Sequence, residues 1–230
     1  MVSQNLAKVR EQIASACQKV GRDPKEVKIV AVTKTHPQET ITEAIEAGIE
    51  YIGENKVQEA EAKHAEIGKA CKWHMVGHLQ RNKVKTALEI FDMIHSLDST
   101  RLADEIEKQA EKQDLLVPCL IEVNTSGEST KFGVAPDKLA ELAAHTLKKE
   151  HIKLVGLMTI GPFTTDEVVI RKAFSELREL RDRVENIFGH YLPHLSMGMS
   201  DDFEIAAEEG ATLIRLGRVL FGPRSTLNKT

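Results

Sequence analysis

The sequence lacks the features that mark membrane, secreted and nucleic-acid-binding proteins. No apolar run reaches the roughly 18 residues of a membrane span, and the first residues do not follow the charged and then apolar layout of a signal peptide. The formal net charge is only -4, from 31 basic and 35 acidic residues, so the overall balance does not favour nucleic acid as a partner. We therefore expect a cytoplasmic protein that binds neither membrane nor nucleic acid.

Cysteine is scarce as well. Cys17, Cys71 and Cys119 are far apart, and an odd count without C-x-x-C spacing favours reduced, buried thiols over disulfides or structural zinc. His74 and His78 have i, i+4 spacing, but the segment between them predicts a strand. In a strand this spacing does not give the helical H-E-x-x-H geometry of a zinc site. We expect no metal site.

What the sequence does contain is one regular alternation of helical and strand-like segments. Helical spacing of apolar residues predicts an N-terminal helix within residues 1–21, which Gly21 ends. Short apolar runs that predict buried strands lie near residues 28–33, 49–53, 73–77, 92–96, 116–123, 152–158, 194–197 and 212–216. Further helices are predicted near residues 38–47, 55–69, 82–89, 100–113, 137–149, 167–188 and 202–209.

Eight strands that alternate with helices close most economically into a single-domain (β/α)8 TIM barrel. We expect this domain to span residues 1–230, with the helix within residues 1–21 packed on the barrel. The 230 residues, 41% of them hydrophobic, suit one domain with a substantial core. The alternative is an open doubly wound sheet, which leaves two edge strands and usually has a Gly-rich turn after its first strand. This chain has K-T-H-P there, at 34–37.

Lys34 ends the first apolar run and is the most informative residue. It shares period-2 parity with Val30 and Val32, so its ammonium is expected to follow their side chains to one face, the interior of the barrel. One interpretation is that the side chain reaches past the strand end into water. The other is a Schiff-base lysine, whose free pKa of about 10.4 is lowered by desolvation and neighbouring cations until the amine attacks a carbonyl.

The loops after the seventh and eighth runs predict an anion site. In a TIM barrel, binding groups lie at the carboxyl ends of the strands, and a phosphate often sits between these two loops. Ser200 is expected to cap a helix that begins near residue 201, which leaves backbone N–H groups pointing at an anion. Gly217 lets the backbone approach a ligand closely. Together with an inward lysine, the two loops predict a phosphorylated carbonyl compound as the ligand.

Segments across the chain resemble one known family. They are A-V-T-K-T-H-P (31–37), I-G-E-N-K-V-Q-E (52–59), H-M-V-G-H-L-Q-R-N-K (74–83), N-T-S-G-E-S-T-K-F-G (124–133), G-L-M-T-I-G (156–161), L-S-M-G-M-S-D-D (195–202) and R-L-G-R-V-L-F-G (215–222). In order and spacing they closely resemble the YggS/PROSC family of pyridoxal 5′-phosphate-binding homeostasis proteins. Lys56 stands where the family motif G-E-N-Y-V-Q-E has a tyrosine.

The resemblance implies a barrel like the N-terminal domain of alanine racemase, with pyridoxal 5′-phosphate (PLP) as the cofactor. It implies that Lys34 forms the Schiff base with PLP. It also implies that Ser200 and the backbone of Gly217 and Arg218 hold the phosphate group. These expectations agree with the anion site and the inward lysine predicted from the residues alone.

The resemblance further implies that Arg215 faces the pyridine nitrogen and that Asn55 lies beside the ring. His78 and Lys131 lie in matching motifs, and the resemblance gives them no settled role. Effective electron sinks usually pair the pyridine nitrogen with a carboxylate that keeps it protonated, whereas a guanidinium has no proton to give. We therefore expect a weak electron sink.

Racemases of the related fold use a second base, a tyrosine from a second domain. This chain ends about eight residues after Gly222, and its only tyrosines, Tyr51 and Tyr191, lie in or near barrel elements. We therefore expect a monomeric, non-catalytic carrier that binds PLP, limits the free aldehyde and passes it to apo-enzymes. Two alternatives stay open: a PLP-dependent amino-acid racemase or decarboxylase, and a cofactor-free Schiff-base aldolase acting on a phosphorylated sugar.

Overall fold

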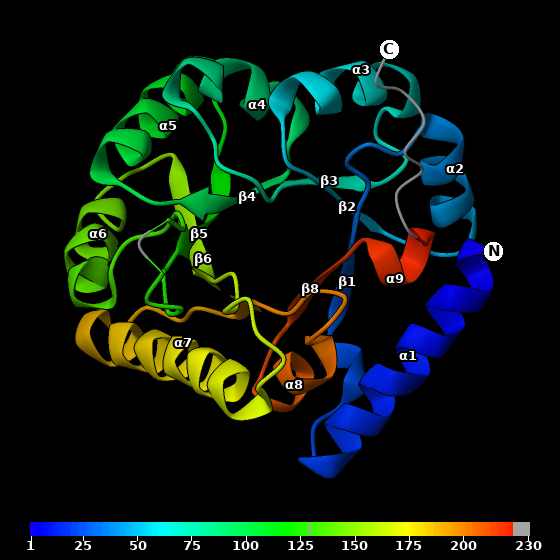
Figure 1. The fold of residues 1–230 in the computed structure, drawn as a ribbon. Helices are drawn as coiled ribbons and strands as arrows, with labels where there is room; N and C mark the ends of the chain where they lie inside the picture. Colours follow the sequence, from blue (N-terminus) through cyan, green and yellow to red (C-terminus); the bar gives the residue numbers. More distant parts are fainter. Residues whose placement is uncertain (129, 223–230) are drawn as a thin grey trace.

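The computed structural model describes residues 1–128 and 130–222, and it is built around a closed barrel of parallel strands. Each strand pairs with the next, and the last pairs with the first, so the sheet has no open edge (Figure 1). The strands are β1 (Lys28–Val32), β2 (Tyr51–Glu54), β3 (Lys72–Met75), β4 (Met93–Leu97), β5 (Val117–Glu122), β6 (Ile152–Met158), β7 (His194–Ser196) and β8 (Leu213–Leu216). The TIM barrel predicted from the sequence is confirmed, and the open doubly wound sheet is wrong.

Helices surround the ring of strands. They are α1 (Val2–Lys19), α2 (Gln38–Glu46), α3 (Val57–Ile67), α4 (Val84–Ile90), α5 (Thr100–Gln113), α6 (Leu139–Thr146), α7 (Glu167–Phe188), α8 (Phe203–Glu208) and α9 (Arg218–Phe221). Single 3-10 turns lie at Pro24–Glu26, Arg81–Lys83 and Pro136–Lys138. Within the described ranges, no helix is both long and apolar enough to cross a membrane. The last eight residues of the predicted domain, 223–230, lie outside the described part of the chain.

The longest helix, α7, shows how the sequence sets these elements. Asp166 begins it, because the Asp166 side chain accepts the backbone N–H groups of Val168 and Val169. Gly189 ends it in the left-handed region, with a φ of 62°. Its buried stripe comprises Ile170, Ala173, Phe174, Leu177, Leu180 and Val184. This apolar stripe drives α7 onto the outside of the barrel.

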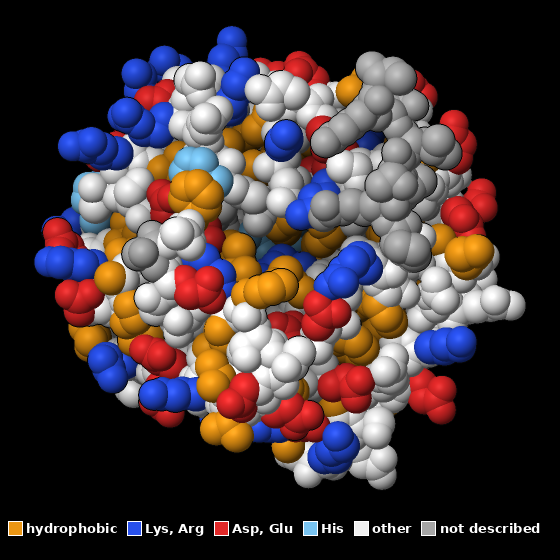
Figure 2. Space-filling view, viewed as in Figure 1, with side chains coloured by type: hydrophobic (Ala, Val, Ile, Leu, Met, Phe, Trp, Pro, Cys, Tyr) orange, Lys and Arg blue, Asp and Glu red, His pale blue; other side chains and the backbone are white. Residues whose placement is uncertain are grey.

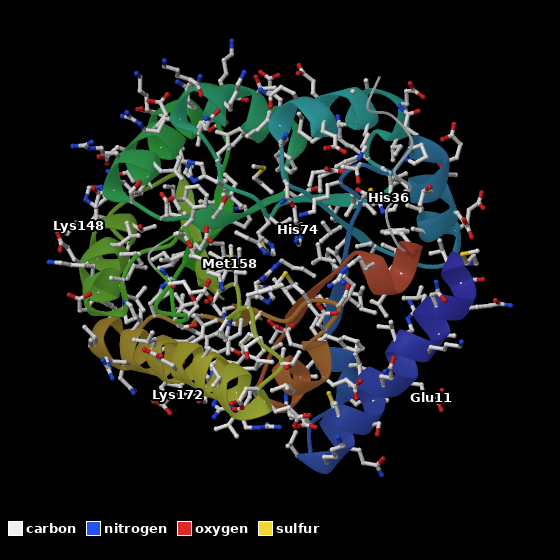
Figure 3. All side chains as sticks on the ribbon, viewed as in Figure 1. Glu11, His36, His74, Lys148, Met158 and Lys172 are labelled. Atoms are coloured by element: carbon white, nitrogen blue, oxygen red, sulfur yellow. The ribbon has the colours of Figure 1, made fainter. Side chains whose placement is uncertain are left out.

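Two apolar layers lie on either side of the barrel wall. The outer layer packs the strands against the helices and holds most of the core. The inner layer comprises Val30, Val76, Leu120, Val155, Met158 and Leu213. Figure 3 shows Met158 and His74 inside the ring of strands. Because the inner layer contains Val30, alternate residues of β1 point into the barrel, as the parity argument predicts.

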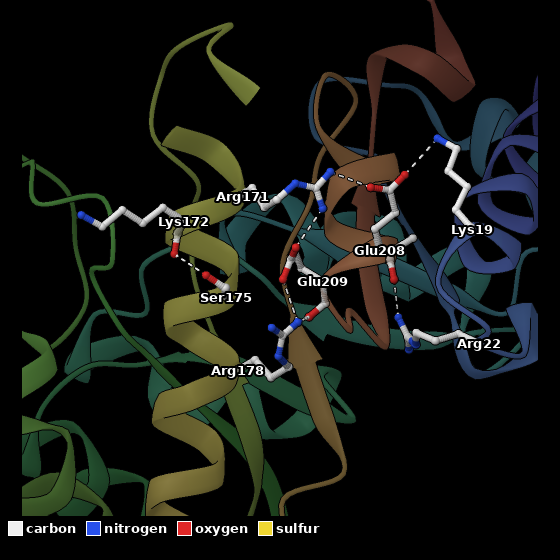
Figure 4. A network of polar contacts seen from close by, with 9 residues as sticks. Lys19, Arg22, Arg171, Lys172, Ser175, Arg178, Glu208 and Glu209 are labelled. Carbon is white, nitrogen blue, oxygen red and sulfur yellow. Dashed lines mark hydrogen bonds and ion pairs between the residues drawn. The ribbon is translucent and has the colours of Figure 1, made fainter. Parts of the chain in front are cut away.

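A network of ion pairs joins α1 and α7 to α8 (Figure 4). Lys19 Nζ lies 2.9 Å from a Glu208 carboxylate oxygen, and Arg171 contacts Glu208 at 2.6 Å and Glu209 at 2.8 Å. Arg178 Nη1 also contacts Glu209, at 2.7 Å. The network therefore fixes α8, which connects the loop after β7 to β8.

Candidate functional site

A cavity of about 310 Å³ opens at the carboxyl ends of the strands. It is lined by all six residues that the sequence resemblance placed at a cofactor, namely Lys34, Asn55, Ser200, Arg215, Gly217 and Arg218. The remaining lining residues were not among the predicted cofactor-binding residues; they are Val32, His36, Val76, Ile160, Phe163, Met199 and Asp201. Larger hollows of about 550 and 760 Å³ lie elsewhere, and none of the six lines them. Figure 2 shows hydrophobic and basic side chains around the hollow at the centre of this face.

Lys34 lies two residues after the end of β1 and is partly buried in the cavity wall. Val32, two residues earlier, lines the same cavity, whereas Thr33 has the opposite parity and is fully buried. Thr35 then turns the chain with a φ of 65°, in the left-handed region that few non-glycine residues occupy. The lysine thus sits between a strand end and a strained turn, inside the mouth of the barrel.

A buried ionic cluster holds the backbone on both sides of the cavity lysine. Lys63 Nζ, from α3, donates to Glu54 Oε1 at 2.6 Å, to Glu59 Oε1 at 2.8 Å and to the Thr33 carbonyl at 2.7 Å. Glu59 also accepts the Thr35 N–H, at 2.5 Å. Burial raises the pKa of Glu54, against the opposing effect of its bonds from Lys63 and Thr33. We name these three charged residues, Glu54, Glu59 and Lys63, the β1-loop triad.

Ser200 occupies the corner of the cavity beside α9. Its Oγ accepts the N–H of Val219 in the first turn of α9, at 3.3 Å. The prediction that Ser200 caps a helix at residue 201 is wrong, because α8 begins at Phe203 and Asp202 precedes it. The buried Asp202 carboxylate instead accepts the N–H of Met199, at 2.6 Å, and closes the turn. Ser200 therefore faces α9 and the adjacent backbone at Gly217.

A charged pair lies at the rim of the same corner. The guanidinium of Arg218, in α9, donates to the carboxylate of Asp201, in the loop after β7. Both side chains are exposed, at 62% and 73%. A basic side chain, a serine hydroxyl and the first backbone N–H groups of a helix are groups that bind phosphate. Asp201 places a negative charge among them.

Arg215 forms the buried base of the cavity. Its Nη1 donates to Ser196 Oγ at 2.6 Å and its Nη2 to the Thr159 carbonyl at 2.8 Å. Burial lowers the pKa of Arg215 to about 10, while Glu122 and Asp202 oppose that shift, so the guanidinium stays charged at neutral pH. Burial raises the pKa of Glu122 to about 7. In the described part of the chain, Arg215 forms no hydrogen bond to either carboxylate.

Asn55 is placed by a close contact between two loops. It follows β2 and packs against Gly77, which follows β3; a Cβ at residue 77 would lie 2.4 Å from the Asn55 carbonyl oxygen. Only glycine fits at residue 77 without moving the backbone. The contact fixes Asn55 at the edge of the cavity.

His78 and Lys131 do not line the cavity. The His78 ring stacks on Phe132 with 4.2 Å between ring centroids, and its Nδ1 lies 3.4 Å from Asp98. Lys131 Nζ donates to Glu128 at 2.7 Å and to the Gly161 carbonyl at 2.7 Å. These contacts connect the loops after β3, β4, β5 and β6 beside the mouth.

The two histidines considered as metal ligands lie in different surroundings. His74 is buried inside the barrel, where its Nδ1 lies 3.0 Å from His95 Nε2, whereas His78 lies among the loops at the mouth. Over residues 1–128 and 130–222, no three His, Cys, Asp or Glu side chains come together as metal ligands. Cys17, Cys71 and Cys119 are free and buried, as predicted.

The chain matches known proteins over nearly its full length. Residues 4–225 match the family described as the alanine racemase N-terminal domain. The pyridoxal phosphate homeostasis protein of Aquifex aeolicus is 46% identical over 222 residues, covering 96% of this chain and 97% of that protein. Among solved structures, PipY of Synechococcus elongatus with PLP bound has a TM-score of 0.86 and 33% identity, over 96% of this chain and 100% of that chain.

An alanine racemase of Clostridium difficile 630 has a TM-score of 0.75 at 14% identity, over 93% of this chain and 56% of that chain. This likeness shows the barrel fold alone. The family model and the relative from Aquifex aeolicus, by contrast, match the sequence itself over nearly the whole chain. The chain therefore belongs to the family of pyridoxal phosphate homeostasis proteins, within the wider alanine racemase N-terminal domain family.

Proposed function

We propose that this chain binds PLP covalently through Lys34 and acts as a non-catalytic carrier in PLP homeostasis. The observation that carries the proposal is that one cavity holds a lysine amine, a phosphate-binding corner and a buried guanidinium. The names of the relatives and the PLP in PipY support the same ligand. The cofactor-free aldolase loses support, since no relative named above points to it.

The lining residues fit the chemical groups of PLP. The cofactor supplies an aldehyde, which forms a Schiff base with a primary amine, and a ring that withdraws electrons. Lys34 provides the amine, while Ser200, Arg218 and the backbone at Gly217 bind the phosphate. Arg215 offers its unused N–H donors to the pyridine nitrogen, which has only a lone pair to accept with. Asn55 bounds the ring from the side of β2.

The same geometry disfavours turnover. Arg215 cannot give a proton to the ring nitrogen, so the electron sink stays weak. Both tyrosines lie within the described residues and neither lines the cavity: Tyr51 packs against His74 inside the barrel, and Tyr191 is exposed. The lining histidine, His36, packs against Phe221 of α9, with ring centroids 4.9 Å apart.

The loops after β3, β6 and β7 form the wall across the barrel from β1. Among the described residues, this wall has four apolar side chains, those of Val76, Ile160, Phe163 and Met199, and one carboxylate, that of Asp201, which is paired with Arg218 at the rim. Two opposed bases are needed to remove a proton from one face of a substrate and return it to the other. The cavity therefore suits holding the cofactor better than racemising an amino acid.

An absorption spectrum before and after borohydride reduction, followed by peptide mapping, tests this proposal. We expect the reduced pyridoxyl group on Lys34, and Lys34→Ala should lose most of the visible band while the fold survives. Lys56→Ala is the matched control, because Lys56 is an exposed lysine near the mouth that does not line the cavity. Predominant labelling of another lysine in the wild type would refute the assignment.

A second measurement separates the carrier from the enzyme. Amino acids should react slowly with the bound cofactor and give no sustained racemisation, decarboxylation or transamination. Racemisation of alanine faster than with free PLP, and abolished by Lys34→Ala, would overturn the carrier. Delivery is tested by mixing the loaded protein with an apo-enzyme and following recovery of that enzyme's activity. The monomeric state and the cytoplasmic location stay predictions.

A further inference from the structure

A continuous chain of buried polar side chains runs behind Arg215, along the inside of the barrel. Arg215 Nη1 lies 2.6 Å from Ser196 Oγ, which lies 2.9 Å from His95 Nδ1. His95 Nε2 then lies 3.0 Å from His74 Nδ1. The chain crosses β8, β7, β4 and β3, and each of its four side chains is at most 4% exposed. Figure 3 shows His74 at its far end, inside the ring of strands.

The chemistry of the four groups fixes which group donates and which accepts at each step of this hydrogen-bond chain. A guanidinium only donates, so Ser196 Oγ accepts from Arg215. The Ser196 hydroxyl proton then has His95 Nδ1 as its acceptor. If His95 Nδ1 carried the proton instead, the buried hydroxyl would accept twice and its own proton would have no acceptor among the described contacts. An unsatisfied buried donor costs about 1–3 kcal/mol, which disfavours that arrangement.

The same donor-to-acceptor direction continues through the two histidines to the end of the hydrogen-bond chain. Because His95 Nδ1 accepts, its Nε2 carries the proton and donates to His74 Nδ1. Burial lowers the pKa of His95 well below its ordinary range and lowers that of His74 to about 4. Both rings are therefore neutral at pH 7, with the proton on Nε2 in each.

This arrangement leaves the charge of Arg215 uncompensated by its hydrogen-bond partners. The two groups that accept from Arg215, Ser196 Oγ and the Thr159 carbonyl, are both neutral. Glu122 and Asp202 act on Arg215 only through space. An anchor on neutral acceptors keeps the guanidinium in place without pairing it to an anion, so its remaining donors and its full charge face the cavity.

We infer that Ser196 and His95 are positioning residues for the cofactor, which hold Arg215 toward the pyridine nitrogen and away from Glu122 and Asp202. This role rests on the proposed binding of PLP, whereas the direction of the chain does not. Removal of the Ser196 hydroxyl frees one side of the guanidinium to turn toward a carboxylate. The ring nitrogen then loses the cation that keeps it unprotonated, and the electronic spectrum of the bound cofactor changes.

The first arm of the test uses the protein without cofactor. Histidine side-chain ¹⁵N NMR at pH 7 should show Nε2–H on both His95 and His74 in the wild type. Ser196→Ala should shift the His95 Nδ1 signal, because that nitrogen loses its donor. Ser96→Ala is the matched control: Ser96 is a fully buried serine on β4 whose Oγ has no hydrogen-bond partner among the described residues. A proton on Nδ1 of either ring would overturn the direction.

The second arm uses the same variants loaded with PLP. Ser196→Ala should displace the absorption maximum and weaken retention of the cofactor by up to roughly tenfold, the effect of one lost hydrogen bond. His95→Phe should displace the maximum in the same direction by less, and Ser96→Ala should leave it unchanged. Wild-type spectra and retention in a folded Ser196→Ala protein would overturn the positioning role.

The two arms separate the possible failures. If the wild type takes up no PLP, the proposed function fails, while the NMR arm still decides the direction of the chain. If the wild type loads and Ser196→Ala behaves like Ser96→Ala, the positioning role fails alone. If Ser196→Ala does not fold, His95→Phe provides the comparison, with thermal melts monitored by circular dichroism as the check on folding.

Discussion

Two buried cations lie beside the cavity, and they differ in the charge of their hydrogen-bond partners. Lys63 lies between two carboxylates of the β1-loop triad, at 2.6 Å from Glu54 and 2.8 Å from Glu59. Arg215 is just as deeply buried, yet its hydrogen-bond acceptors are a serine hydroxyl and a backbone carbonyl. Lys63 is therefore neutralised within the protein, and Arg215 is not.

The difference separates holding the backbone from binding a ligand. A cation bonded to two carboxylates and a carbonyl has its donors satisfied, so it fixes the chain around Lys34 and leaves no charge for the cavity. A cation that is hydrogen-bonded only to neutral groups keeps its charge available for a ligand that binds in the cavity. Four variants test this contrast, and they follow from the largest expected effect to the smallest.

Lys63→Met breaks the neutralised site. It leaves Glu54, which is fully buried, without its cation, and removal of one partner of a buried pair costs about 3–5 kcal/mol. Urea denaturation should show this loss in the free energy of unfolding. Lys72→Met is the matched control, since Lys72 pairs with Asp92 at the surface and should change stability little. Equal stability of the two variants would mean that the triad does not hold the loop.

Glu122→Gln tests whether Arg215 is compensated from a distance. Burial raises the pKa of Glu122 from 4.5 to about 7. Between these values the folded state binds more protons than the unfolded state, so this group makes stability fall as pH rises through that window. Glu122→Gln removes the dependence, and above pH 7 we expect it to be more stable than the wild type by about 3 kcal/mol.

The measurement is urea denaturation at pH 5 and pH 8, with Glu141→Gln at the surface as the control. At pH 5 Glu122→Gln and the wild type should be close in stability. A variant that is less stable than the wild type at pH 8 would show that Glu122 is an ionised partner of Arg215. The contrast between the two cations would then disappear.

Ser200→Ala sharpens the contrast from the ligand side, because in the proposed carrier Ser200 binds the phosphate while Lys34 provides the chromophore. Loss of one charge-assisted hydrogen bond costs about 1.5–3 kcal/mol, or roughly ten- to a hundredfold in affinity. The visible band should keep its position while PLP dissociates faster, as measured by trapping the released aldehyde. Unchanged release would remove Ser200 from the phosphate site.

The sequence predicted the strands and the position of Lys34 better than it predicted the hydrogen-bond partners that hold the site residues. Periodicity placed the eight strands and therefore the mouth of the barrel, and strand parity turned Lys34 inward. Both are local patterns. The supports of Arg215 are not local: Ser196 and His95 are separated by 101 positions, and Thr159 accepts from Arg215 across 56 positions. No spacing rule identifies such partners before the barrel closes.

Ser200 shows the same limit at short range. A serine before a predicted helix indicates an N-cap, but the Asp202 carboxylate two residues later takes the N–H of Met199 and starts the turn. The Ser200 hydroxyl instead accepts the N–H of Val219 in α9, 19 positions later in the sequence. Asp202, at the N-cap position of α8, makes no side-chain cap bond to this helix either. Only the tertiary structure shows which backbone N–H each side chain accepts.

Asp201→Asn has the smallest expected effect. It tests whether a cation without a carboxylate partner binds the ligand better than a paired one. Arg218 resembles Lys63 in being paired with a carboxylate, that of Asp201, but both partners are exposed. If Arg218 binds the phosphate as proposed, Asp201 competes with that phosphate for the guanidinium and adds its own negative charge at the rim, so its neutralisation should slow the release of PLP. The gain in retention should be at most about fivefold, because exposed ion pairs contribute little. It should shrink as salt is added, since screening weakens both the competition and the repulsion. Weaker retention in Asp201→Asn would mean that Asp201 orients Arg218 for the phosphate rather than competing with it.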